Sequence, residues 1–176
     1  MKASQLVHGH HLLDATGGLG IDTYYLAQKT KNATYVERDA SLAHLAAANF
    51  AALRAPIEVK NQDGLLALRE SKADLVYLDP HRRDQQNQKI ISLRHYQPDV
   101  TQCLNQLTYP GRTSLIKVSP MLDLKAGYQE LTAVKEIWII SLRNDCKEVI
   151  FMLNADAVAA PRLRTFNLLE NGLRQI

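Results

Sequence analysis

The sequence predicts an α/β protein with a doubly wound, mostly parallel sheet of seven strands whose last strand is antiparallel. Short runs rich in aliphatic and β-branched residues alternate with helical stretches along most of the chain. Several of these runs are almost continuously apolar, which is typical of strands buried on both faces of a parallel sheet. Only a few residues, within SLRNDCK, separate the last two runs. Because this connection is too short for a crossover helix, the last two strands are expected to pair antiparallel.

The elements follow one another as β-α pairs. The expected strands are residues 10–15, 33–38, 57–62, 74–79, 113–118, 137–142 and 148–153. The expected helices are residues 23–29, 41–54, 64–71, 100–107 and 124–134. Asp39 and Asp63 stand where a helix N-cap is needed. The tail holds one further candidate strand, residues 162–169, whose place in the sheet the pattern does not predict.

Length and composition indicate one globular domain. The chain has 176 residues, 46% hydrophobic and 22% charged, which suits a single domain with a core at 10–153 and an extension at 154–176. The net charge of +3 allows an anionic partner without requiring one. No apolar run approaches the roughly 20 residues that span a bilayer, and the first residues lack the apolar stretch of a secretory signal. With two distant cysteines, we expect a reduced, cytoplasmic protein that binds no membrane.

A glycine-rich turn, LLDATGGLGIDT (residues 12–23), joins the first strand to the first helix. Gly17, Gly18 and Gly20 allow a sharp turn and a close approach of a ligand to the backbone. Glu37 ends the second strand, where a carboxylate can accept two ribose hydroxyls. The alternative is a turn that only packs the helix against the strand. The combination favours a nucleotide-type cofactor.

The charges around the turn favour S-adenosylmethionine over a dinucleotide. Asp14 and Asp22 would repel a pyrophosphate, and Thr23 replaces the third glycine of the dinucleotide pattern. The same carboxylates suit an ammonium and a sulfonium. Asp63 is placed to accept from an adenine amino group, although it can also simply cap its helix. The residues expected at the cofactor are Asp14, Thr16, Gly17, Gly18, Gly20, Asp22, Glu37, Arg38, Asp63, Gly64 and Asp79.

DATGGLG, YVERD, NQD and YLDP, on successive strand ends, resemble motifs of class I S-adenosylmethionine-dependent methyltransferases. The chain is most similar to a bacterial group of these enzymes that carries a C-terminal THUMP-like domain, through LDATGGLGIDTYYL, DPHRRD, IKVSPMLDL and RNDCKEVI. The resemblance covers about residues 12–153. It implies the Rossmann-like methyltransferase fold, S-adenosylmethionine as cofactor, and methylation of a base in RNA. Members of that group have further helices before the first strand and the THUMP-like domain after the last, which are not expected here.

The resemblance also implies that Asp79 and Pro80 are the catalytic residues, at the end of the fourth strand. Amino-methyltransferases of similar layout carry D/N-P-P-Y here, and the acid and a backbone carbonyl orient the target NH2. This chain reads D-P-H-R, which lacks the aromatic residue of that pattern, and Tyr77 is expected to point away from the site. Methylation of an exocyclic amine is therefore not the expected variant of the reaction.

Polar residues after the later strands are expected to form a substrate-binding rim: His81, Arg82, Arg83, Lys117, Ser119, Arg143 and Asn144. Together with Arg94 the basic members would form a lip suited to RNA phosphates or to a small anion. The plainer reading makes them loop residues and surface ion pairs. The histidines of HGHH (residues 8–11) lack further ligands at suitable spacing, so no metal site is expected. Neither cysteine falls on a motif, which disfavours carbon-5 methylation.

Two other functions remain open at this point. A domain of this fold with D-P-H-R can bind cofactor or RNA without turnover. An NAD-dependent oxidoreductase is the less favoured alternative, because of the missing third glycine and the flanking carboxylates. The oligomeric state is not predicted.

Overall fold

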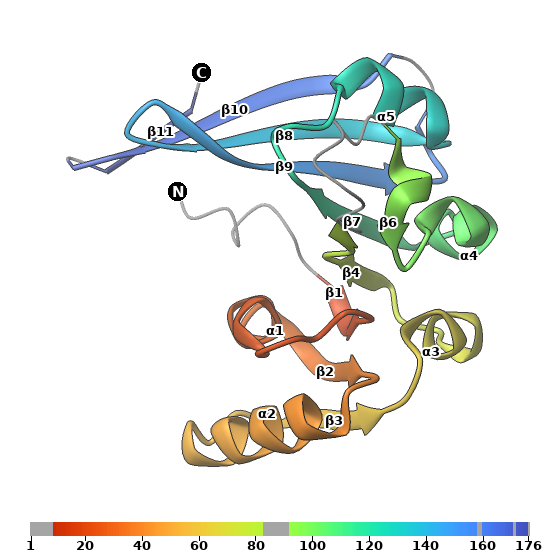
Figure 1. Ribbon diagram of the computed structural model, residues 1–176, viewed down its shortest axis with the longest axis vertical. Coiled ribbons are helices and arrows are strands. Elements are labelled where there is room, and N and C mark those ends of the chain that lie inside the picture. The colour runs from red at the N-terminus through yellow and green to blue at the C-terminus, as the bar shows by residue number, and fades with distance from the viewer. Residues whose placement is uncertain (1–8, 83–91, 158–159, 171, 176) are drawn as a thin grey trace. The chain divides into compact units, whose positions relative to one another are not determined.

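The computed structural model describes residues 9–82, 92–157, 160–170 and 172–175 (Figure 1). The chain forms two compact units, Met1–Leu78 and Asp79–Ile176, and each unit is described by itself. No helix among these residues is long and apolar enough to cross a membrane.

The first unit is a regular β-α alternation. Its elements are β1 (Gly9–Asp14), α1 (Ile21–Ala27), β2 (Thr30–Glu37), α2 (Ala40–Ala52), β3 (Ile57–Asn61), α3 (Gly64–Glu70) and β4 (Leu75–Leu78). The four strands are all parallel and lie in the order β3-β2-β1-β4. The parallel sheet expected from the sequence is therefore confirmed, with strand ends that differ from the expected ones by a few residues.

Helices cover both faces of this sheet: α1 and α2 lie on one side and α3 on the other (Figure 1). Tyr35 of β2 meets Phe50 of α2 edge to face, with ring centroids 5.5 Å apart. The cluster around them contains Tyr35, Ala43, Ala46 and Phe50, with Tyr24, Ala55, Ile57 and Val59 at its edge. Burial of this apolar surface is the main stabilising term for the α2 layer.

Both predicted N-caps are confirmed. The carboxylate of Asp39 accepts the backbone N–H groups of Ser41 and Leu42, and that of Asp63 accepts the N–H of Leu66. Each cap satisfies N–H donors that have no partner inside the helix, so it fixes where α2 and α3 begin.

The second unit is richer in β structure. Its elements are β5 (His81–Arg82), η2 (Leu93–His95), β6 (Tyr96–Gln97), η3 (Val100–Cys103), α4 (Leu104–Leu107), β7 (Thr113–Val118), α5 (Leu124–Glu130), β8 (Val134–Leu142), β9 (Asp145–Asn154), β10 (Arg162–Leu169) and β11 (Gly172–Gln175). Its main sheet has the order β7-β9-β8-β10-β11. As expected, β9 runs antiparallel to its neighbours, here β7 and β8.

The expected total of seven strands is too low. The tail adds β10, which pairs parallel with β8, and β11, which pairs antiparallel with β10. Phe166 of β10 is buried and meets Trp138 of β8, with ring centroids 6.1 Å apart. The tail joins the sheet because this contact buries two large aromatic side chains, a long-range gain that local sequence does not reveal.

Three expected segments also differ in detail. Residues 100–107 form a 3-10 turn followed by one short α-helix, and the helix expected at 124–134 ends at Glu130. Leu131 is extended and Ala133 has a φ of 55°, which stops the helix. His81 and Arg82 lie in β5, where His81 pairs with Gln97, instead of in a loop.

A tight turn joins β8 to β9. Arg143 and Asn144 form it with φ values of 51° and 65°, as in a type I′ hairpin turn. The N–H of Asn144 donates to the side-chain oxygen of Asn167, and the Asn167 amide donates back to Asn144 at 2.6 Å. Asn167 is buried in β10, so the turn is attached to the neighbouring strand.

Candidate functional site

The glycine turn of the first unit is held at both ends by backbone hydrogen bonds. The N–H of Ala15 donates to the carbonyl of Tyr77 in β4, and the N–H of Gly17 donates to Val36 in β2 at 2.8 Å. The N–H of Gly20 returns to Gly17, and α1 begins at the next residue. The turn is therefore fixed at the carboxyl ends of the parallel strands, where open α/β sheets bind ligands.

Two positions at the site require glycine because neighbouring atoms lie very close: Gly17 in the turn and Gly64 at the start of α3. A Cβ at Gly17 would lie 2.1 Å from the ring of Tyr35, and one at Gly64 would lie 1.8 Å from the carbonyl oxygen of Ala15. Tyr35 and Ala15 thus occupy the space that any larger residue would need. The start of α3 is pressed against the end of β1.

Asp14 lies inside the turn. It is buried, and its carboxylate accepts the N–H of Thr16 at 3.0 Å and the hydroxyl of Thr23 in α1 at 2.5 Å. These bonds tie the end of β1 to α1. The negative charge of Asp14 remains beneath the glycine turn, while its oxygens bind the protein itself.

Glu37 is held by two backbone donors. Its Oε2 accepts the N–H of Gly18 at 2.9 Å, and its Oε1 accepts the N–H of Asp39 at 2.8 Å. Asn61 supports the same strand end by donating to the carbonyls of Glu37 and Arg38. A carboxylate offers about four lone-pair sites, so each oxygen of Glu37 retains acceptor capacity. Its orientation is set before any ligand binds.

Tyr35 stabilises the turn, because its hydroxyl donates a hydrogen bond to the carbonyl of Gly18. Burial, reinforced by the charges of Glu37, Asp14 and Asp39, raises the pKa of the Tyr35 phenol well above its usual value. The phenol therefore remains protonated and continues to donate across the physiological range.

Tyr77 corrects the sequence expectation, because its side chain reaches the site instead of pointing away. Its hydroxyl donates to Asp22 at 2.7 Å, in the first turn of α1. Tyr77 lies opposite Asp14 in the β1–β4 register, so the two share the face that α1 covers. Side chains alternate between the two faces of a strand, so the sequence could have shown that Tyr77 and Asp14 share a face. That conclusion requires the pairing of β1 with β4, which the sequence does not provide.

The other expected cofactor residues of this unit are placed simply. Asp63 is exposed and caps α3, which is the simpler of the two roles expected for it. Arg38, which directly follows β2, is also exposed. Thr16 and Gly20 belong to the turn already described.

In the second unit, Asp79 forms an ion pair. Its Oδ2 lies 2.8 Å from Nζ of Lys117 in β7, and the same ammonium lies 3.5 Å from Oε1 of Glu148 in β9. The Lys117 side chain is only 15% exposed, and Pro80 is buried. Glu148 was not expected at this place. The motif RNDCKE contained it, but its contact depends on the β7–β9 register.

The expected basic lip is only partly assembled. The guanidinium of Arg143 pairs with Glu170 at 3.3 Å at the exposed tip of the β8–β9 turn. Lys117 pairs with Ile150, which in turn pairs with Trp138, so Lys117 and Trp138 lie at the same level of the sheet. At about 3.3 Å per residue, Arg143 lies on the order of 15 Å further along β8. The structure therefore does not bring these two expected substrate residues together.

The remaining rim residues are separate from that tip. Ser119 forms a turn after β7, where its hydroxyl accepts the N–H of Met121 at 3.2 Å. His81 and Arg94 are exposed. The side chain of Arg82 and all of Arg83 lie outside the described residues. Asn144 uses its amide in the contact with Asn167.

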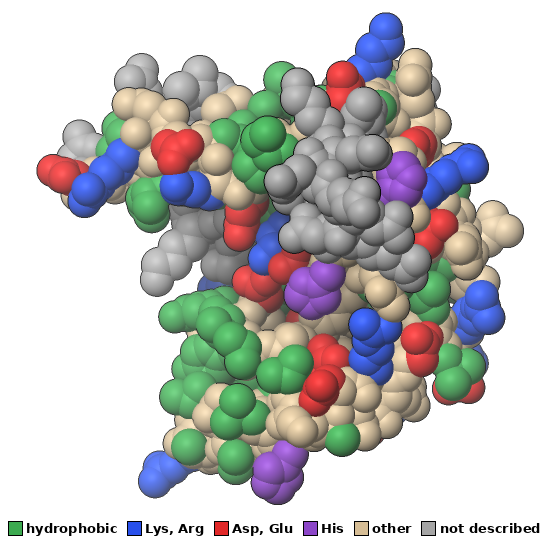
Figure 2. All heavy atoms as spheres, in the orientation of Figure 1, with side chains coloured by type: hydrophobic (Ala, Val, Ile, Leu, Met, Phe, Trp, Pro, Cys, Tyr) green, Lys and Arg blue, Asp and Glu red, His purple; other side chains and the backbone are tan. Residues whose placement is uncertain are grey.

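An apolar surface lies beside the glycine turn. Leu19, Ile21 and Tyr25 are 57%, 60% and 59% exposed. Hydrophobic side chains gather over α1 in the space-filling view (Figure 2). This surface offers an apolar contact near the carboxylates of the turn.

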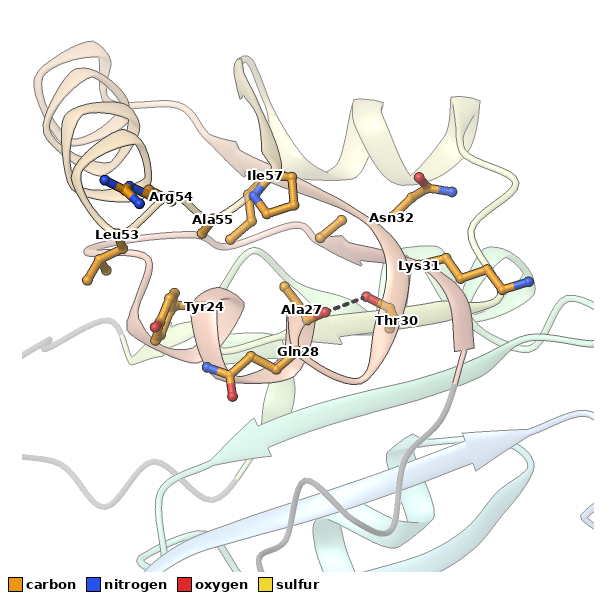
Figure 3. Close-up of a pocket in the computed structure, with 12 residues that line it drawn as sticks. Tyr24, Ala27, Gln28, Thr30, Lys31, Asn32, Leu53, Arg54, Ala55 and Ile57 are labelled. Carbon is orange, nitrogen blue, oxygen red and sulfur yellow. Dashed lines mark hydrogen bonds between the residues drawn. The ribbon is translucent and has the colours of Figure 1, made fainter.

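A cavity of about 350 Å³ lies at the amino ends of strands in the first sheet, opposite to the strand ends that carry the glycine turn. It is lined by residues at the amino ends of β2 and β3, among them Thr30 and Ile57 (Figure 3). Lys31 and Arg54 point away from one another there, and Thr30 donates to the carbonyl of Ala27. It is therefore distinct from the candidate site.

The HGHH segment enters β1. His11 Nε2 lies 2.8 Å from the Thr34 hydroxyl, which donates to Glu58. Among the described residues, which exclude His8, no group of three or more His, Cys, Asp or Glu side chains is arranged to hold a metal ion.

No family model matches the chain, and no curated protein is significantly similar to it. Among solved structures, the chain is similar to a protein from Porphyromonas gingivalis W83 that is assigned as a methyltransferase. The two are 25% identical with a TM-score of 0.78, over 98% of this chain and 45% of that one. The chain thus spans less than half the length of that protein.

Two further structures are similar in fold. An rRNA methylase from Streptococcus thermophilus is 14% identical with a TM-score of 0.55, over 85% of this chain and 89% of that one. A protein from Listeria monocytogenes assigned as a class I S-adenosylmethionine-dependent methyltransferase is 20% identical with a TM-score of 0.57, over 88% and 58%. The fold is therefore that of class I methyltransferases.

The residues of the first unit fit such a cofactor in their chemistry. Glu37 presents preset acceptors that suit ribose hydroxyls, and Asp22 and the buried Asp14 supply negative charge that suits an ammonium and a sulfonium. Within the turn, Gly18 has room where a Cβ would stand, whereas the rings of Tyr35 and Phe50 fill that space at Gly17 and Gly20.

Proposed function

We propose that the protein is an S-adenosylmethionine-dependent methyltransferase that methylates a base in RNA. The observation that carries the proposal is the Glu37 carboxylate, fixed by two backbone N–H groups at the rim of the glycine turn. Similarity to methyltransferase structures supports the transfer reaction. An RNA substrate of this kind fits a cytoplasmic protein.

The cofactor would be held by residues of the first unit. Glu37 accepts the ribose hydroxyls, the turn at Gly17 and Gly18 passes close to the ligand, and Asp22 faces its ammonium with Tyr77 keeping the carboxylate in place. When bound, this cofactor supplies a methyl group on a positively charged sulfur. Asp63 stands at the third strand end to accept from the adenine amino group.

The acceptor would meet Asp79, which follows β4 in the chain. Its carboxylate accepts a hydrogen bond from the acceptor and orients the lone pair, so positioning supplies most of the catalysis. The lone pair of the acceptor would take the methyl group, and the cofactor would keep the electron pair of the bond that breaks. An N–H acceptor must then release a proton, for which Asp79 is the base.

Two observations support a base in RNA as the acceptor. The apolar surface of Leu19, Ile21 and Tyr25 offers a contact for a flat ring, and base–aromatic contacts stabilise binding without sequence preference. One structure of similar fold is an rRNA methylase. By its motifs, we assign the protein to the group of methyltransferases that carries a THUMP-like domain. We also propose that His81, Arg82, Arg83 and Ser119 contact the substrate.

A binding module without turnover is the second candidate. It is favoured by the ion pair of Asp79 with Lys117, because a carboxylate neutralised by an ammonium is a poor proton acceptor. Transfer of label from methyl-labelled S-adenosylmethionine to total RNA distinguishes the two. Transfer that is lost in Asp79→Ala excludes a binding-only role.

Calorimetry with S-adenosylmethionine tests the cofactor site. Glu37→Gln should weaken binding about tenfold or more, since hydrogen bonds to a charged acceptor contribute about 1.5–3 kcal/mol. Glu70→Gln, at the exposed end of α3, is the matched control and should bind as the wild type does. No binding to the folded wild type at millimolar cofactor would show that the proposal is wrong.

A further inference from the structure

We propose that the cavity at the amino ends of β2 and β3 is a second ligand site, which binds a small organic anion with an apolar body and holds its carboxylate or phosphate group at Arg54. The cavity has a volume of about 350 Å³, within the range of small-molecule sites. It lies at the strand ends opposite to the glycine turn. The site is therefore separate from the candidate cofactor site and does not rest on the proposed function.

The walls of the cavity come from two parts of the first unit (Figure 3). The second half of α1 and the start of β2 form one side, and the connection from α2 to β3 forms the other. Apolar side chains, among them Leu53, Pro56 and Ile57, belong to this lining. They give an apolar body a surface to pack against.

The charge of the lining has one sign. Among the described residues that line the cavity, Lys31 and Arg54 are charged, and none is an Asp or Glu. The side-chain amides of Gln28 and Asn32 add uncharged hydrogen-bond donors. Two cations and two amides without a carboxylate favour an anionic ligand over a cationic one.

Arg54 stands at a position where the backbone favours glycine. It follows α2 with a φ of 52°, in the left-handed region. Its N–H donates to the carbonyl of Ala51, and the N–H of Ala55 donates to that of Phe50, which is the hydrogen-bond pattern of a Schellman motif. Glycine is the usual residue at this point of the motif, because a Cβ is strained there. The chain therefore carries an arginine at a cost in stability.

No contact of the Arg54 side chain offsets this strain in the part of the chain that the structure describes. The residue is exposed, and it forms no ion pair or side-chain hydrogen bond with a described residue. A guanidinium can hold a carboxylate or a phosphate through two parallel hydrogen bonds. Lys31 lies on the other side of the cavity and points away from Arg54 (Figure 3). We therefore assign the anionic group of the ligand to Arg54.

An NMR titration with 3-phenylpropionate tests the site, with the backbone amide signals of Gln28, Arg54 and Ala55 as reporters. These signals should shift with a dissociation constant of about a millimolar, as for a ligand of roughly eleven non-hydrogen atoms. Phenyl phosphate carries the other anionic group on the same kind of body, and the tighter binder of the two identifies the preferred group. The neutral 3-phenylpropionamide should bind at least about fivefold more weakly. Inorganic phosphate, which lacks the apolar body, should cause smaller shifts than either.

Three substitutions of Arg54 separate its charge from its shape. Arg54→Gln removes the charge and should weaken binding of 3-phenylpropionate about tenfold or more. Arg54→Lys keeps the charge and should bind within about threefold of the wild type. Arg54→Gly should lose binding as Arg54→Gln does, yet keep or raise the melting temperature, because glycine relieves the strain. Lys29→Gln, the matched control, removes an exposed charge that does not line the cavity and should bind as the wild type does.

Five outcomes would overturn the inference: no shift of the reporter signals with either anion at about 10 mM, equal binding of 3-phenylpropionate and its amide, shifts with inorganic phosphate as large as with phenyl phosphate, wild-type binding by Arg54→Gln, or a lower melting temperature of Arg54→Gly. Shifts at Gly18 and Glu37 in place of the reporter signals would also overturn it, because the anion would then occupy the glycine turn. Failure of the folded protein to bind S-adenosylmethionine would instead overturn the proposed function, and the anion site would stand.

Discussion

Gly64 leaves no room for a side chain where α3 begins. The nearest atom to a Cβ there is a backbone oxygen, that of Ala15, which cannot rotate away. The only relief is a movement of α3 away from the end of β1, and that movement would displace Asp63 as well. A single added methyl group should thus act on stability and on the proposed cofactor site together.

We therefore expect Gly64→Ala to lower the free energy of unfolding by about 3 kcal/mol, at the upper end for overpacking, and to weaken cofactor binding. Chemical denaturation and calorimetry measure the two effects. Gly111→Ala is the comparison: Gly111 has a φ of 80° and open space around it, so only backbone strain of about 1–2 kcal/mol is expected, with cofactor binding unchanged. Equal losses in both variants would contradict the steric explanation.

Residue-scale features were predictable when their cause is local. Asp39 and Asp63 cap the helices that directly follow them, and a cap needs only the next three residues. Tyr77 and Glu148 were missed because their contacts depend on which residues stand opposite them in β1 and β7. Register is a property of paired strands, and no local window of sequence contains it.

The β8–β9 turn shows how one element is attached to another. The N–H of Asn144 has its acceptor in β10, on the buried Asn167. Asn167→Ala would remove that acceptor and leave Asn144 without its amide partner. We expect a loss of about 1–3 kcal/mol in the free energy of unfolding, measured by denaturant titration.

Arg143→Gly is the complementary change in the same turn. Arg143 has a φ of 51°, which costs an ordinary residue about 1–2 kcal/mol, and its ion pair with Glu170 is exposed. This variant should keep or raise stability. A large loss would mean that the Arg143 ion pair contributes more than its exposure suggests.

Asp74 joins the start of β4 to β1. Burial opposes its ionised form, but the backbone N–H groups of His10 and His11 outweigh burial and hold the pKa of the Asp74 carboxyl below its usual value. A lowered folded-state pKa contributes stability above the unfolded pKa of about 3.9, and the contribution is lost as pH falls through the folded value.

Asp74→Asn should thus be about 1 kcal/mol less stable than the wild type at pH 7, a modest figure because the site is partly exposed. The difference should shrink below about pH 4 and vanish at lower pH. Thermal unfolding at pH 7, 4 and 2.5 checks this. A stability difference between Asp74→Asn and the wild type that does not change with pH would show that the substitution acts through packing and not through the charge of Asp74.

Element patterns were predicted well in the first unit and less well in the second. Each β-α step of the first unit carries local signals: α2 and α3 each begin after a capping acid, and α1 begins after the glycine turn. The candidate strand at 162–169 is confirmed as β10, but its place beside β8 was not predicted, because it depends on the burial of Phe166 against Trp138. The short pairing of β5 with β6 likewise depends on residues that are far apart in sequence.

At the scale of the whole molecule, net charge bears on how the proposed RNA substrate would be bound. The chain carries 21 Lys and Arg against 18 Asp and Glu, and two of the basic residues expected at the substrate, Lys117 and Arg143, are paired with acids. These two pairs reduce the positive charge that Lys117 and Arg143 offer to RNA phosphates.

We expect RNA binding with a shallow salt dependence, a slope of about −2 to −3 in a plot of log K against log salt, as for three to four phosphate contacts on a single strand. Fluorescence anisotropy between 50 and 300 mM salt measures it. A slope steeper than about −5 would mean that a broader basic surface binds RNA than the described residues present.

The two N–H groups that hold Glu37 also bear on how fast a ligand binds. Because Gly18 and Asp39 fix the carboxylate in advance, Glu37 itself should lose little conformational entropy when the proposed cofactor binds. Association should then depend linearly on ligand concentration, without the plateau of a slow conformational step. Differences in affinity among cofactor analogues should appear in how long each remains bound.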